Sequence, residues 1–146
     1  MAGKFKLQSV LNYRQSLEDQ AQQVLTASLQ RQQDLEDQLL TQQQALDKAD
    51  IELKQRQQEG MTVAEIDLYE SQIHHCRRII EDIQQRLQRL ERRIEEERKE
   101  LLHAARERQV LEKLKDKQEA EYRQELSRQE RVMLDEISLQ NKGKKS

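Results

Sequence analysis

The chain has 146 residues, of which 34% are hydrophobic and 37% are charged, with one Phe, three Tyr and neither Trp nor Pro. So few large apolar groups argue against a compact globular core. The 26 basic and 28 acidic residues nearly cancel, leaving a net charge of −2. No single-sign field is therefore available to attract nucleic acid or an anionic membrane surface. The composition is dominated by good helix formers such as Gln, Glu, Leu and Arg, and it predicts long helices.

Nothing in the sequence indicates secretion or membrane insertion. Residues 1–6 lead directly into polar amphipathic sequence, and no run approaches the roughly 18 apolar residues that a membrane span needs. The lone Cys76 cannot form an intramolecular disulfide, which suits a reducing compartment. We therefore expect a cytoplasmic protein without direct membrane insertion.

The sequence after the central glycine carries the signals of a helix start. Thr62 is placed to cap the backbone N–H of Glu65, and the Glu65 side chain is placed to reach back to Thr62. Met61 and Ile66 occupy the positions of a hydrophobic staple over this cap. A helix is therefore predicted to begin at Thr62.

Three glycines divide the chain: Gly3, Gly60 and Gly143. Because glycine interrupts helical sequence, these positions predict where the segments end. We expect one coiled-coil unit with a first helix over about 5–58, a turn over about 59–62, a second helix over about 62–140 and a basic, flexible tail over 141–146.

Apolar residues recur in steps of three and four along the second helix, which is the heptad seam of a left-handed coiled coil. The seam comprises Ile66, Tyr69, Ile73, Cys76, Ile80, Ile83, Leu87, Leu90, Ile94, Glu97, Leu101, Ala104, Arg108 and Leu111. Glu97 and Arg108 interrupt it, and we interpret them as polar residues that fix the register, with a weak point in the hairpin as the alternative. The first helix follows the same period with polar gaps at Ser28, Arg31 and Gln42.

Two helices joined by a short turn run antiparallel, and facing residue numbers are expected to add to roughly 120. The predicted fold is therefore all-α, a long two-helix antiparallel coiled-coil hairpin. The apolar stripes then match in pairs: Leu39 with Ile80, Leu25 with Ile94, and Leu11 with Leu111.

The second helix extends beyond the end of the first by roughly 25 residues, or about 37 Å at the helical rise. In this C-terminal single-helix overhang, Leu111, Tyr122 and Met133 lie eleven residues apart, as do Leu126 and Ile137. An eleven-residue repeat straightens or reverses the supercoil. Tyr122, Leu126, Met133 and Ile137 are thus predicted to form an apolar stripe without a partner inside the chain.

The sequence indicates no catalytic, cofactor or metal site. Phosphate cradles need clustered glycines, and two helices that share one seam enclose no water-excluding cavity. His74, His75 and Cys76 are consecutive, so about 100° separates neighbouring side chains and they cannot converge on one ion. Cys76 is interpreted as a small buried apolar group. The alternating charges over residues 91–100 indicate a solvated face.

Three further features point to a family. The chain opens with the pattern F-x-L-x-x-V-L-x-Y-R from Phe5 to Arg14, turns at Gly60-Met61-Thr62 with Tyr69 shortly after, and closes with Asp135-Glu136. With these features it resembles, over essentially its whole length, the FliJ family of flagellar protein-export components. None of the motifs is a catalytic signature, and the resemblance implies a protein that is not an enzyme.

The resemblance implies a central-stalk-like coiled coil that inserts into the ring of the hexameric flagellar export ATPase and promotes its assembly and activity. It also implies contact with an export-gate membrane protein and with export chaperones, at the inner membrane of the flagellar base. The residues expected to contact the ATPase ring lie on the terminal arms: Phe5, Leu7, Leu11, Tyr13, Tyr122, Leu126, Met133 and Ile137. Those expected to contact the gate lie early in the second helix: Tyr69, Gln72, Cys76, Ile79 and Ile83.

Three alternatives remain open at this stage. The chain could be the equivalent stalk of a virulence-type secretion injectisome. It could be a scaffold that self-associates through residues 115–140. A coiled coil that binds nucleic acid is disfavoured by the balanced charge.

Overall fold

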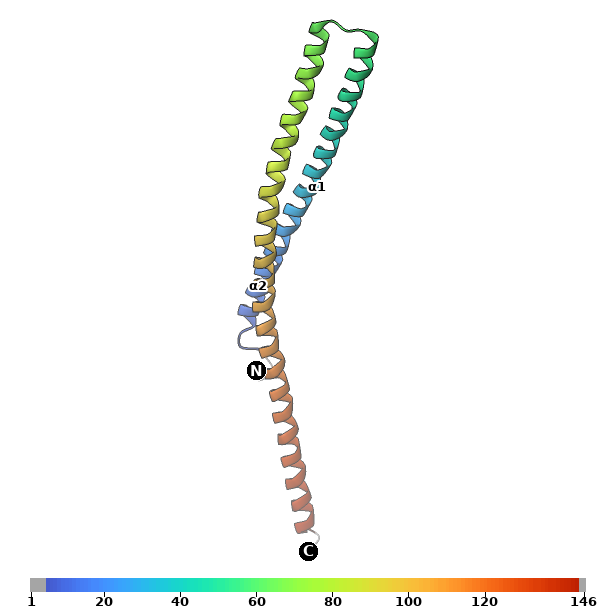
Figure 1. Cartoon of the computed structure of the whole chain (residues 1–146). Coiled ribbons are helices and arrows are strands. Elements are labelled where there is room, and N and C mark those ends of the chain that lie inside the picture. The colour runs from blue at the N-terminus through green and yellow to red at the C-terminus, as the bar shows by residue number, and fades with distance from the viewer. Residues whose placement is uncertain (1–4, 145–146) are drawn as a thin grey trace. The chain divides into compact units, whose positions relative to one another are not determined.

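The computed structural model describes residues 5–144, which form two α-helices. Helix α1 spans Gln8–Glu59 and helix α2 spans Val63–Lys144 (Figure 1). No strand occurs within the described residues. The predicted all-α two-helix hairpin is confirmed. The chain divides into a turn unit, residues 21–101, and a terminal unit made of residues 5–20 and 102–144.

Both outer ends of the helices differ from the prediction by a few residues. Helix α1 begins at Gln8 rather than near residue 5, because residues 6 and 7 form a turn closed by a hydrogen bond from the Gln8 N–H to the Phe5 carbonyl at 3.2 Å. Residues 141–144, predicted as a flexible tail, continue α2. The helix tolerates Gly143 because it lies so close to the helix end. Lys142 lies in the last turn, where the helix dipole stabilises a cation. The last two residues of the predicted tail lie outside the described part of the chain.

The turn between the helices forms where the sequence predicts it, but the expected hydrogen bond between the Glu65 side chain and Thr62 does not form within the described residues. Gly60 follows the last residue of α1 with φ of 97°, a left-handed conformation that glycine adopts without the steric cost of a Cβ. The Thr62 hydroxyl accepts a hydrogen bond from the Glu65 backbone N–H at 3.2 Å, so Thr62 caps α2. Met61 and Ile66 are both half-buried, as a hydrophobic staple requires. The predicted helix start is confirmed.

Replacing Thr62 with Ala is expected to lower the free energy of unfolding by about 1 kcal/mol, because the Glu65 N–H loses its acceptor. The measurement is urea unfolding followed by circular dichroism at 222 nm. Thr41→Ala is the matched control, since the Thr41 hydroxyl only donates back to the Asp37 carbonyl within α1. A loss of the same size in both variants would show that the effect is not due to the cap.

The core of the turn unit lies along the predicted seam. The buried cluster consists of Leu25, Leu35, Ile83, Leu90 and Ile94, with Leu39, Ile79, Leu87 and Leu101 packed against it. Arg31 and Leu35 of α1 border the same hollow as Arg86 and Leu90 of α2. This placement confirms that facing residue numbers add to about 120 in the turn unit.

Two polar residues lie in this core. Ser28 and Glu97 are buried, and Glu97 is only 6% exposed. The Nε of Arg93 donates to Oε1 of Glu97 at 3.1 Å, whereas Oε2 of Glu97 has no hydrogen-bond partner among residues 5–144. A buried acceptor without a partner lowers stability.

The terminal unit pairs the start of α1 with a middle stretch of α2. Leu11 is buried, and with Gln8 and Gln15 it borders a hollow whose other wall includes Glu112 and Lys115. Leu11 of α1 therefore faces a part of α2 up to one turn beyond Leu111, its predicted partner. The physical reason is a polar pair that fixes the register here.

Arg108 makes that pair. Its Nε donates to Glu18 at 2.7 Å across the two helices, and its Nη1 donates to Glu112 at 2.7 Å within α2. These hydrogen bonds, of which the one to Glu18 contributes most, raise the pKa of Arg108 above its ordinary value, so the guanidinium stays charged. The arrangement agrees with the interpretation of Arg108 as a residue that fixes the register.

Candidate partner-binding surfaces

The last part of α2 has no other segment of the terminal unit over it (Figure 1). Every residue from 123 to 143 is exposed. On this stretch Leu126, Met133 and Ile137 lie within roughly 40° of one another around the helix, at 100° per residue. Met133 is 61% exposed and Ile137 is 49% exposed. We call Leu126, Met133 and Ile137 the C-terminal stripe.

Tyr122, predicted as part of that stripe, differs from the other three because it is half-buried. Phe5 is only 8% exposed although it precedes α1, so Phe5 also packs within the terminal unit. The covered part of α2 thus extends further than the helical seam predicts. Tyr122 is therefore less accessible than the sequence predicted, and the exposed stripe begins at Leu126.

Sequence reasoning missed three exposed apolar residues on the same stretch. Val132, Leu134 and Leu139 all expose about half or more of their surface and lie on other sides of the helix from the stripe. Arg128 and Gln129 border a shallow hollow together with Val132 and Met133. The high density of apolar residues after residue 131 could have indicated them. The prediction considered only residues spaced eleven apart.

Charged side chains on this stretch pair only within α2. Arg128 donates to both carboxylate oxygens of Glu125, at 2.8 and 3.2 Å. The hydrogen bond from Arg128 lowers the pKa of Glu125, and the same bond raises the pKa of Arg128. Both groups are exposed, so the pair orients side chains without adding much stability.

The N-terminal candidates for ring contact fall into two classes. Phe5 and Leu11 are buried within the terminal unit, where they hold α1 against α2. Leu7 and Tyr13 are exposed, and Tyr13 shows 59% of its surface. Leu7 and Tyr13 are therefore the N-terminal residues accessible to a partner.

The five candidates for gate contact also differ in accessibility. Cys76 and Ile83 are 7% and 5% exposed and belong to the core of the turn unit, so a partner cannot reach them without opening the hairpin. Gln72 is exposed, and Tyr69 and Ile79 are half-buried. The Arg56 guanidinium lies 5.7 Å from the centre of the Tyr69 ring, a cation–π contact across the turn end of the hairpin. Gln72, Tyr69 and Ile79 remain as an accessible set.

His74, His75 and Cys76 lie in α2, and their side chains do not share one side of the helix. Cys76 is a free, buried thiol, whereas His74 and His75 are exposed. No group of three or more His, Cys, Asp and Glu side chains is placed to hold a metal ion within residues 5–144. Neither helix, as far as it is described, has a stretch long and apolar enough to cross a membrane.

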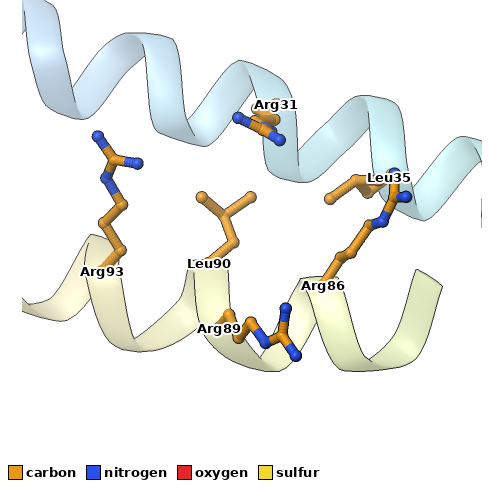
Figure 2. A pocket seen from close by; sticks show the side chains of 6 residues that line it. All are labelled: Arg31, Leu35, Arg86, Arg89, Leu90 and Arg93. Atoms are coloured by element: carbon orange, nitrogen blue, oxygen red, sulfur yellow. The ribbon is translucent and has the colours of Figure 1, made fainter. Parts of the chain in front are cut away.

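A basic hollow was not expected from the sequence. It lies between the helices of the turn unit and is bordered by Arg31, Leu35, Arg86, Arg89, Leu90 and Arg93 (Figure 2). We call it the arginine groove. It was missed because Arg31 lies on one helix and the other three arginines on the second, so only the pairing of the helices brings them together.

The comparison with known protein families identifies the family of the chain. The model of the family described as flagellar FliJ protein matches residues 3–146, nearly the whole chain. Neither a curated protein nor a solved structure matches. The matched range includes the turn, the seam and both terminal segments.

Proposed function

Because the chain belongs to the FliJ family of flagellar protein-export components, we propose that it is the coiled-coil stalk of the hexameric flagellar export ATPase. The match supports the resemblance drawn from the opening, turn and closing motifs. In the proposed role the chain carries out no chemistry itself. It contacts the ATPase ring and promotes its assembly and activity.

The observation that carries the proposal is the exposed C-terminal stripe. Leu126, Met133 and Ile137 share one side of a helix that nothing else in the terminal unit covers. Covering such side chains in a partner contributes roughly 1.5–3 kcal/mol for each one fully buried. Leu7 and Tyr13 add exposed side chains from the N-terminal end of the same unit. We therefore propose that the terminal unit is the part that enters the ring.

Contact with the export gate is proposed for the start of α2. Gln72 is exposed, and Tyr69 and Ile79 are half-buried, so these three are accessible in the closed hairpin. Export chaperones are further proposed partners. With these partners, the protein is placed in the cytoplasm, peripherally associated with the inner membrane at the flagellar base.

The test is ATP hydrolysis by the cognate export ATPase with and without the full chain. We expect the rate of ATP hydrolysis to rise and then saturate as the concentration of the chain increases, because a stalk stabilises the assembled ring. An unrelated antiparallel coiled coil of similar length is the control. Unchanged hydrolysis at saturating concentration would refute the role as a stalk.

A self-associating scaffold is the second candidate, because a second copy could also cover the C-terminal stripe. Light scattering at micromolar concentration distinguishes the two functions. A monomer that stimulates the ATPase supports the stalk, whereas a stable dimer sealed through the stripe supports the scaffold. The description of the matched family as flagellar favours the flagellar system over an injectisome.

A further inference from the structure

We infer that the arginine groove of the turn unit is a docking surface for an acidic, amphipathic segment of a partner protein. Four arginines border the groove around an apolar floor of Leu35 and Leu90, and Figure 2 shows the Arg89 side chain on the side of α2 that faces away from α1. The groove belongs to a different unit from the C-terminal stripe, so this inference does not depend on ring contact.

Like charges from both helices border the groove. Arg31 of α1 borders the groove together with Arg86 and Arg93 of α2. Figure 2 shows Arg86 and Arg93 extending from α2 toward α1, on either side of Leu90. Residues that flank a coiled-coil seam usually carry opposite charges across it, and like charges there repel. An acidic group bound in the groove would therefore meet positive charge from both helices.

Two of the four arginines form no ion pair within the part of the chain that the structure describes. Arg86 pairs with Asp82 and Arg93 pairs with Glu97, each at 3.1 Å along α2. Arg31 and Arg89 form no ion pair with any residue from 5 to 144. A guanidinium presents a planar fork of donors that matches a carboxylate. Arg31 and Arg89 can bind carboxylates of a partner without breaking a contact of the hairpin.

The shape of the groove favours an elongated occupant. An adjoining hollow bordered by Val24, Ala27 and Ser28 shares Arg31, Leu90 and Arg93 with it, so the depression continues along the seam. Arg86 and Arg93 are seven residues apart on α2, which is about 10.5 Å at the helical rise. Carboxylates two helical turns apart on a partner helix would match this spacing.

The apolar floor favours a protein segment over a phosphate polymer. Leu35 and Leu90 can contact an apolar side chain that lies between the partner's carboxylates. The phosphates of a nucleic acid backbone have no apolar group to place on this floor. The net charge of −2 gives no long-range attraction for a polyanion.

The experiment measures binding of a fluorescent synthetic peptide to the full chain by anisotropy. The probe is an Ala-rich helix of about 20 residues with Glu two turns apart and Leu between them on one face. We expect saturable, salt-sensitive binding that Glu→Gln changes in the peptide abolish. Arg31→Gln with Arg89→Gln is expected to raise Kd at least about tenfold, which corresponds to about 1.4 kcal/mol.

Arg77→Gln with Arg92→Gln is the charge-matched control, because both are exposed arginines of α2 outside the groove. It should change Kd less than about twofold. An equal loss in both double variants would overturn the inference. Binding to a DNA duplex or to phosphatidylserine vesicles is measured as well. Tighter binding to either of these than to the peptide, lost in the Arg31→Gln, Arg89→Gln variant, would also overturn the inference, since the groove would then bind phosphate.

The stability of the Arg31→Gln, Arg89→Gln variant provides an independent readout. Because the groove places like charges together, urea unfolding should show unchanged or higher stability than the wild type. A fall in the unfolding midpoint would show that these arginines support the fold, and the inference would be overturned.

Discussion

Changing Met133 and Ile137 together to Glu is expected to weaken stimulation of the export ATPase at least about tenfold, since a loss of 1.4 kcal/mol of binding already gives that factor. Both side chains are half-exposed or more and lie on the uncovered part of α2. Two carboxylates at these positions would have to be desolvated on entering an apolar partner surface. The measurement is the concentration of chain that gives half-maximal stimulation.

The same double change should leave unfolding of the hairpin nearly unaltered. No residue from 123 to 143 is buried, so neither side chain contributes to the core of its unit. Glu is also a good helix former, so α2 itself should persist. This separation between folding and partner binding distinguishes an interaction surface from internal core.

Gln124→Glu with Ser138→Glu is the matched control. Both residues are exposed on the same stretch and lie roughly 100° or more around the helix from the stripe. Near wild-type stimulation is expected for this variant, although it carries two added charges. Equal loss in both variants would indicate a general effect of charge, and full stimulation by the Met133, Ile137 variant would place the ring contact elsewhere.

The seam and the turn could be predicted from sequence because each depends on local signals. Every predicted seam position from Ile66 to Leu111 is buried or half-buried. The cap at Thr62 and the glycine at 60 require only neighbouring residues, and both appear where the sequence indicates. Heptad periodicity is robust because one misplaced residue changes little over several turns.

The features that were missed depend on how distant residues meet. The burial of Phe5 could not be read from helical periodicity, because Phe5 lies outside a helix. The shift of Leu11 along α2 follows the hydrogen bond between Glu18 and Arg108, two residues that are 90 positions apart. A periodic pattern gives the face of each helix but leaves the relative shift between helices to such specific pairs.

The candidates for gate contact show a different limit. Cys76 and Ile83 belong to the seam, and the same apolar side chain cannot pack in the hairpin core and remain open to a partner. The resemblance indicates only which region of α2 is expected to contact the gate. The structure is needed to tell which residues of that region are accessible and which belong to the core. Gln72 is the exposed one of the five.

Replacing Glu97 with Leu is expected to stabilise the hairpin by roughly 1–2 kcal/mol, because a buried carboxylate with an unsatisfied oxygen is exchanged for an apolar group. Glu97 is 6% exposed, and Oε2 has no partner among the described residues. Its one ion pair is with Arg93, whose side chain is 67% exposed and can turn to solvent when the carboxylate is removed. Leu at this position would also continue the seam between Ile94 and Leu101. Urea unfolding measures the change.

Two further variants test this reasoning. Glu96→Leu, at the exposed neighbouring position, should alter stability by less than about 0.5 kcal/mol, because it leaves the seam untouched. Arg108→Leu should destabilise the terminal unit, because Glu18 and Glu112 lose the guanidinium that they share. If Glu97→Leu destabilised the hairpin, the buried carboxylate would have a partner that contributes more than its desolvation costs.

The ATPase assay on the Glu97→Leu variant then decides between the two interpretations of this residue. If Glu97 only fixes the register, a more stable hairpin in the same register should stimulate the ATPase as well as the wild type does. If it provides a point at which the hairpin must open or twist, higher stability should come with lower maximal stimulation. Because Arg108 retains its pair with Glu18 and holds the register independently, we expect undiminished stimulation.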